Sequence, residues 1–398
     1  MIQNFTALLQ EPRKVAVLVL LLSLFLTGSM LLSTNLLTPS NPEFDQPWDH
    51  HKYIYMAEQD PLDFHIAPFC WRILNPLLAK WLPFDLQSNF LLITFTGIWI
   101  TGVAVFFLAN RFTNSVAFGF VGMLIYFSLG WAVKYGLYNF WLPDSFSMML
   151  MIVAIYGILT KNDYLFMFFS LIGVGFKEGV IFVTPLYYTL NTDRFYNWRL
   201  IRKNVFLALP VVVFLIIIRI LIPPLNDDLK YLSTLPDTLK IVQEGVSTYN
   251  YGALVKMIGL QRLNTLTIKS VYDYSIGTFG VWLVFLPLVC IRKNSQLFVR
   301  LLPFLLLVYA QPLFAINTRR LLIIGFPALL LLALNGAKTV SERLQINPLF
   351  FAFFSFLYVI LNLISPDFMP PIFLQLSVLG SFLLLIFTWW RIDIHRFK

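Results

Sequence analysis

Acidic and histidine side chains gather in one stretch of this chain, residues 37–88. Seven of the 20 acidic residues and three of the four histidines lie there. Carboxylate oxygens are the ligands that hard divalent cations prefer, which makes Asp45 and Asp49, with His50 beside them, a candidate site for a dissociable divalent cation. No HExxH or similar spacing is present, so a structural metal is less favoured. An ordinary solvated loop is the alternative explanation for these acids.

Asp49 stands at the start of a helical pattern. It follows Trp48, an aromatic type that favours the membrane interface. Tyr53, Met56 and Ala57 then occur at i+4, i+7 and i+8, which is the spacing of one helix face. The pattern predicts an amphipathic helix on the membrane surface with Asp49 in its first turn, where the helix dipole favours a carboxylate.

Charged side chains also interrupt apolar stretches further along the chain. Lys177 and Glu178 lie in the middle of the apolar segment 164–190, and a charge at membrane depth is by default a candidate functional residue. A mutual ion pair, or snorkelling to the interface, is the alternative for these two residues. Asp144 opens another apolar run, where it could also serve as a helix N-cap.

Three arginines complete the set of candidate residues. Arg319 and Arg320 are adjacent in a short loop expected on the outer side, which runs against the usual charge bias of membrane proteins. Because arginine binds phosphate through paired N–H groups, they indicate an anion site, with lipid headgroups as the alternative ligand. Arg72 lies on the largely apolar surface of a helix expected over residues 69–82.

The composition defines the class of protein that must position these residues. Of 398 residues, 58% are hydrophobic and only 12% are charged, about half the charge of a typical globular protein. This excludes a soluble enzyme, a disordered chain, a coiled coil and a nucleic-acid binder. Two cysteines exclude a disulfide scaffold and a cysteine-based zinc site. Long continuous apolar runs, rather than short alternating ones, predict an all-α polytopic membrane protein.

Ten apolar runs are candidate membrane spans, and the segment 164–190 is either one long helix or a hairpin of two short ones. The runs are 15–36, 90–109, 116–133, 145–159, 205–222, 276–291, 301–316, 321–335, 349–364 and 372–390. The positive-inside rule favours the hairpin, because only then do the later short basic loops fall in the cytoplasm. We therefore expect about twelve crossings, with both termini cytoplasmic.

This topology divides the chain into three parts. Residues 1–222 form an N-terminal transmembrane module that contains the first outer loop, residues 37–88. Residues 223–275 are too polar to cross and form a second extracytoplasmic loop. Residues 276–398 form a C-terminal transmembrane bundle. The net charge of +9 is then mainly a signal of orientation.

The layout resembles the GT-C superfamily of membrane glycosyltransferases, which place an early acidic residue in a long first outer loop. The series Asp49, Tyr53, Ala57, Pro61, Arg72, Pro76, Leu77 and Ala79 is similar to that of the catalytic subunit of the GPI mannosyltransferase and of bacterial relatives. The run Phe176-Lys177-Glu178 with Pro185 looks like the short hairpin of the family. Arg319-Arg320 with Pro327 and Ala333 looks like its arginine-then-proline span.

The resemblance implies inverting transfer of a sugar from a polyprenyl-phosphate donor to a glycan, lipid or protein acceptor at the outer membrane face. Asp49 would be the general base, although Asp45 remains an alternative because the two acids are four residues apart rather than in the adjacent pattern of many members. Lys177, Arg319 and Arg320, with Arg72 in reserve, would bind the phosphate. Asp45, Asp144 and Glu178 would orient the acceptor or the cations, and Trp48, Tyr53 and Trp141 would stack on sugars.

Three other functions remain open from the residues alone. An O-antigen ligase or polymerase, or an acyltransferase, would also use an outer loop with arginines. A transporter would place its charges at mid-membrane and often show repeats, and a non-catalytic assembly subunit would need no outer cavity. The only N-glycosylation sequon, at Asn4, falls on the expected cytoplasmic side, which favours a bacterial plasma membrane.

Overall fold

The computed structural model describes residues 11–37, 48–192, 194, 196–226, 228–236, 239, 242–243, 246–247, 267–289, 291–313 and 318–396. The described chain is almost entirely helical, as expected. Its helices in the N-terminal part are α2 (Pro12–Ser33), η1 (Thr34–Leu36), α3 (Trp48–Glu58), η3 (Pro61–Asp63), η4 (Phe69–Trp71), α4 (Leu74–Trp81), α5 (Leu86–Thr113), α6 (Val116–Phe127), α7 (Lys134–Tyr138), α8 (Asp144–Thr160), α9 (Asp163–Phe176), η5 (Glu178–Val183), α10 (Thr184–Asn191) and α11 (Trp198–Leu221).

The later elements are also mainly helical. They are α12 (Leu229–Thr234), the short antiparallel pair β1 (Val242–Gln243) and β2 (Val246–Ser247), α14 (Ile268–Val289), α15 (Ile291–Ala310), η7 (Gln311–Leu313), α16 (Thr318–Leu322), η8 (Ile323–Gly325), α17 (Phe326–Leu344), α18 (Pro348–Ile364) and α19 (Ile372–Arg396).

Five described helical segments are long and apolar enough to cross a membrane. They are Pro12–Leu36, Leu86–Thr113, Trp198–Leu221, Ile268–Val289 and Thr318–Leu344. Several shorter apolar helices, among them α6, α8, α9 and α18, accompany them. This composition indicates an all-helical membrane protein. The count of twelve crossings and the cytoplasmic termini remain predictions.

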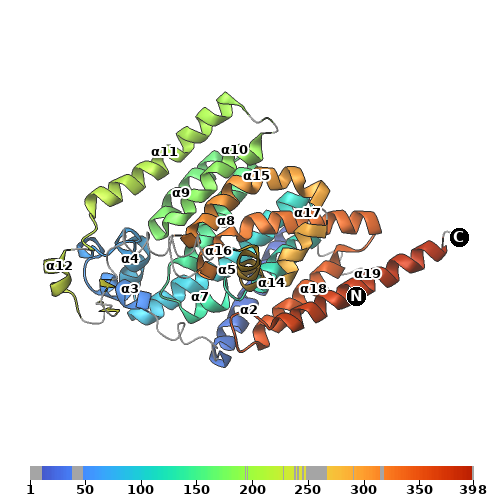
Figure 1. The fold of residues 1–398 in the computed structure, drawn as a ribbon, viewed down its shortest axis with the longest axis horizontal. Coiled ribbons are helices and arrows are strands. Elements are labelled where there is room, and N and C mark those ends of the chain that lie inside the picture. Colours follow the sequence, from blue (N-terminus) through green and yellow to red (C-terminus); the bar gives the residue numbers. More distant parts are fainter. Residues whose placement is uncertain are drawn as a thin grey trace.

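Helix α5 packs against α2, α6 and α8, and α8 packs in turn against α9. Helices α14 and α17 pack together, and α18 packs against α6. In Figure 1, α3, α4 and α12 gather at the left of the molecule, whereas the C-terminal end of α19 lies at the right. Described parts of the two segments expected to form outer loops, residues 48–88, 223–226 and 228–236, therefore lie together at this end of the molecule (Figure 1). The amide N–H of His65 donates to the hydroxyl of Tyr231 at 2.9 Å, and Asn226 bonds both backbone groups of Ala67.

The segment 164–190 is a hairpin. Helix α9 ends at Phe176, Lys177 is extended, η5 packs back against α9, and α10 continues the returning segment. The hydroxyl of Tyr187 in α10 donates to Asp163 at the start of α9, at 2.5 Å. A side chain at Gly173 would meet Val180 at 2.6 Å, so glycine is what lets η5 fold closely against α9.

Several predicted helix boundaries are wrong: the helix of the span expected over 301–316 ends at Ala310, the span expected over 321–335 is interrupted by η8, and two further cases have a clear steric cause. The single helix expected over 69–82 is broken at Arg72 into η4 and α4, because the ring of Pro76 would clash with a helical carbonyl at Arg72, four residues earlier. The span expected over 116–133 ends at Phe127. Beyond it the backbone turns against a neighbouring segment, where a Cβ on Gly130 would lie 1.3 Å from the carbonyl oxygen of Phe368.

The end of α18 is completed by a residue from far upstream. The side chain of Lys134 is fully buried, and its Nζ donates to the carbonyl oxygens of Asn362 at 2.9 Å and Ser365 at 2.6 Å. The last carbonyls of a helix have no partner within the helix, and a cation at that end is favourable. Lys134, the first residue of α7, therefore caps α18 and joins the two helices.

Candidate functional site

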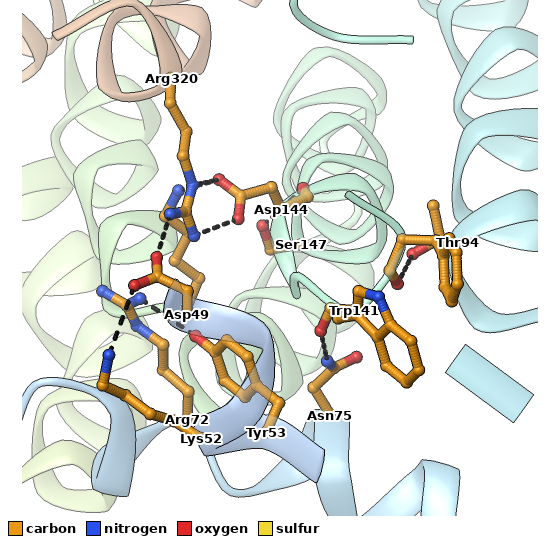
Figure 2. Close-up of polar contacts among 12 residues, drawn as sticks. Asp49, Lys52, Tyr53, Arg72, Asn75, Thr94, Trp141, Asp144, Ser147 and Arg320 are labelled. Atoms are coloured by element: carbon orange, nitrogen blue, oxygen red, sulfur yellow. Dashed lines mark hydrogen bonds and ion pairs between the residues drawn. The ribbon is translucent and has the colours of Figure 1, made fainter. Parts of the chain in front are cut away.

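Helix α3 presents Asp49 to the interior of the molecule. Tyr53, Met56 and Ala57 are buried and hold one face of α3 against the core, as the pattern predicted. The Oδ2 atom of Asp49 accepts a hydrogen bond from Nη1 of Arg320 at 2.6 Å, and its Oδ1 lies 3.8 Å from Nζ of Lys52. The Asp49 carboxylate is thus held between two cations, as Figure 2 shows.

Arg320 joins Asp49 to a second carboxylate. Its Nε and Nη2 donate to the two oxygens of Asp144 at 3.1 and 2.8 Å, while its Nη1 donates to Asp49 (Figure 2). Paired bonds of this kind fix the guanidinium in one plane. Arg320 comes from α16 and Asp144 from the start of α8, so the contact joins segments 176 residues apart.

Asp144 also forms an ion pair with Lys177 at the tip of the hairpin. The alternative role of Asp144 as an N-cap is wrong, because Pro143 occupies that position and the Asp144 side chain turns to the two cations. The segment before α8 is itself fixed. Asn75 donates to the carbonyl of Trp141 at 3.0 Å, and Thr94 donates to the carbonyl of Phe140 at 2.7 Å.

A second ion pair adjoins the first group. Arg72 donates through Nε and Nη2 to Glu178, at 2.9 and 2.6 Å, and through Nη1 to the hydroxyl of Tyr53 at 3.2 Å. Glu178 therefore pairs with Arg72, and Lys177 with Asp144. The alternative that Lys177 and Glu178 neutralise each other is wrong, since each has a different partner.

Seven charged residues thus form what we call the ion-pair network. They are Asp49, Lys52, Arg72, Asp144, Lys177, Glu178 and Arg320. The four cations are nearly buried and exceed the three carboxylates by one. Because isolated charges are costly to bury, the pairing explains how the group is tolerated.

The cations determine the protonation of Asp49. Burial opposes ionisation of its carboxyl, but the charges of Arg320 and Lys52 outweigh burial and hold the pKa of Asp49 below its ordinary value. Burial lowers the pKa of Lys52, an effect that Asp49 partly offsets. Burial also raises the pKa of Tyr53 to about 12, so this hydroxyl stays protonated at neutral pH.

Sequence reasoning found six of the seven network residues and missed Lys52. Its side chain is buried, and its Nζ lies 4.4 Å from the centre of the Phe69 ring. The signal that could have found it is its position three residues after Asp49, since residues at i and i+3 are neighbours on a helix.

Arg319 lies outside the network although it adjoins Arg320. It is exposed and its guanidinium lies 5.6 Å from the Trp131 ring, in a space that a side chain at Gly277 would fill. Successive helical residues point about 100° apart, so the two arginines face different neighbours.

The expected aromatic residues differ in their surroundings. Tyr53 is fully buried, with its ring edge-on to Phe69, so no ring face is open to a sugar. Trp141 is partly exposed and its ring packs against Phe140 and Phe90. The side chain of Trp48 lies outside the part of the chain that the structure describes.

The described residues do not fit a divalent cation at Asp49. Its carboxylate faces Arg320 and Lys52, whose positive charges oppose a metal ion. Within the described ranges no group of three His, Cys, Asp or Glu side chains could hold a metal ion. Asp45 falls outside those ranges, and His50 packs against the rings of His51 and Trp141.

A small cavity borders the network. Its volume is about 10 Å³, close to that needed for one water molecule. Its lining includes the apolar side chains of Met148, Val180 and Ile324 together with Asp144 and Lys177. Asp144 and Lys177 are the two network residues that line this cavity.

No protein-family model matches the chain, and no curated protein matches it in sequence.

Proposed function

We propose that this protein is an inverting membrane glycosyltransferase of the GT-C type. It takes a sugar from a polyprenyl-phosphate donor and transfers it to a glycan, lipid or protein acceptor at the extracytoplasmic face. The proposal includes twelve crossings, cytoplasmic termini and a bacterial plasma membrane.

The observation that carries the proposal is the position of the ion-pair network. Asp49 lies on a short helix outside the long apolar helices, Asp144 and Arg320 lie within three residues of a helix start, and Lys177 lies at a hairpin tip. In the proposed topology these helix ends lie at the outer interface, where the phosphate of a lipid-linked donor also lies. A transporter differs in placing its charges at the midplane of the bilayer.

In the proposed reaction, Asp49 accepts the proton of the acceptor hydroxyl. The acceptor oxygen forms a bond to C1 of the sugar with inversion, and the bond from C1 to the phosphate oxygen breaks. The electron pair leaves with the polyprenyl phosphate, which gains one negative charge. Arg320 and Lys177 stabilise that charge, and Arg72 supports it from the adjoining pair. No step is assigned to a metal ion.

The test is sugar transfer by the full-length protein in proteoliposomes that contain a polyprenyl-phosphate sugar and a mixture of candidate acceptors. Asp49→Asn should lower the rate by about 100-fold or more, the usual contribution of a general base. Glu58→Gln is the matched control, because Glu58 is exposed on the same helix. Transfer by Asp49→Asn at the wild-type rate, with normal protein level, refutes the assignment of the base. Absence of transfer by the wild type from any polyprenyl-phosphate sugar refutes the function.

A further inference from the structure

Two carboxylates share Arg320, and they hold it unequally. Asp144 accepts two hydrogen bonds from the guanidinium and is also paired with Lys177. Asp49 accepts one, from Nη1. The Asp49 side chain is 31% exposed and that of Asp144 is 14% exposed. Asp144 is therefore the fixed partner of Arg320, and Asp49 is the partner that another anion can replace.

The contact with Arg320 works against the proposed role of Asp49. A carboxylate that accepts a charged hydrogen bond is a weaker base than one that does not, and proton transfer in catalysis depends on base strength. The other titratable groups that interact with Asp49 are His50, Lys52 and Tyr53 on its own helix, and Arg72 from the segment between η4 and α4. Among these described groups, Arg320 donates the short hydrogen bond to Asp49. Removing this one bond would strengthen the base most.

We propose that the donor phosphate exchanges with Asp49 at Nη1 of Arg320, so that binding of the donor releases the base. This inference rests on the proposed function. Asp49 stays beside Lys52 after the exchange, so the bound phosphate adds one negative charge to the network. Asp144 and Lys177 keep Arg320 in place during the exchange. The base is thus held inactive until the phosphate that must leave is already bound, which protects the enzyme from hydrolysing donor that is only partly seated.

The first measurement compares two pH profiles of transfer by the wild type at saturating acceptor. The acid limb of kcat/KM for the donor reports the enzyme without donor, and that of kcat reports the enzyme with donor bound. Loss of one nearby positive partner raises a carboxyl pKa by about one unit or more, so the kcat limb should lie at least about one unit higher. Coincident limbs overturn the exchange while leaving the proposed function standing.

The second measurement needs no turnover. A water-soluble carbodiimide modifies protonated carboxyls, and the modified sites are quantified by mass spectrometry of the full-length protein in mixed micelles near pH 5. Polyprenyl monophosphate should increase modification of Asp49 several-fold, whereas uncharged polyprenol should not, and Glu58 should respond to neither. An increase without any sugar transfer supports the exchange and refutes the glycosyltransferase assignment. Unchanged or reduced modification of Asp49 overturns the exchange.

Discussion

The ion pair between Arg72 and Glu178 offers a quantitative test of the network. Two hydrogen bonds, at 2.9 and 2.6 Å, join a nearly buried guanidinium to a carboxylate that is 32% exposed. In Glu178→Gln the neutral amide keeps one acceptor oxygen and nearly the same shape. The buried charge of Arg72 then keeps only one such acceptor and the hydroxyl of Tyr53.

Breaking a fully buried ion pair by removing one partner costs about 3–5 kcal/mol. Because Glu178 is about a third exposed and glutamine retains one bond, we expect about 2 kcal/mol for Glu178→Gln. In the background of Arg72→Met the same change should cost close to zero, since no buried charge is left unpaired. The coupling energy between the two sites is therefore expected at about 2 kcal/mol.

The assay measures the unfolding of four proteins in mixed dodecyl sulfate micelles through the fluorescence of the ten tryptophans, and it yields the free energy of unfolding of each. The four are the wild type, the two single variants and the double variant, with Glu58→Gln as the control on an exposed acid. A loss of about 2 kcal/mol shifts the folded-to-unfolded ratio roughly 30-fold, which the titration resolves. If Glu178→Gln is as stable as Glu58→Gln, or if the two single effects are additive, the pair does not stabilise the network as argued.

Three further predictions concern pH, packing and topology. Burial, with the charge of the adjacent histidine, lowers the pKa of His50 from 6.5 to about 4. As the pH falls from 6.5 to about 4, His50 becomes protonated in the unfolded chain but stays neutral in the native protein, so the melting temperature should fall. In His50→Gln the melting temperature should depend less on pH over the same range. Gly130→Ala should destabilise the protein by more than about 2 kcal/mol, because the new methyl group clashes with a backbone carbonyl. Gly380 is in open space, so Gly380→Ala is the control and should not destabilise the protein. Equal melting temperatures of the two variants would contradict the packing argument. In a variant lacking both native cysteines, an impermeant maleimide added to intact cells should label Asp60→Cys and not Lys161→Cys, and labelling of both would reject the topology.

The helices were largely predictable because each long apolar run must satisfy its own backbone hydrogen bonds in a membrane. Local breaks were less predictable. The reversal at Lys177 followed from the charge of the loops along the chain. The break at Arg72 arises from a steric effect of Pro76, which prevails over the continuous apolar pattern.

The members of the site were predictable from residue type, since a charge among apolar residues needs a reason. Their partners were not, because Asp49 and Arg320 are 271 residues apart and meet only through helix packing. Sequence gave no means to separate Arg319 from Arg320. The role of Lys52 was not predictable because a lysine in a segment rich in charged residues is ordinarily exposed. Its burial depends on how α3 packs against the core.

The cap that Lys134 places on α18 has a consequence for biosynthesis. The ribosome adds Asn362 228 residues after Lys134, so the lysine enters the membrane region long before its acceptors exist. Until α18 arrives, the ammonium group must remain hydrated, because an unpaired charge is not stable in an apolar interior. We therefore expect the start of α7 to remain hydrated in the nascent chain until α18 is inserted late in translation.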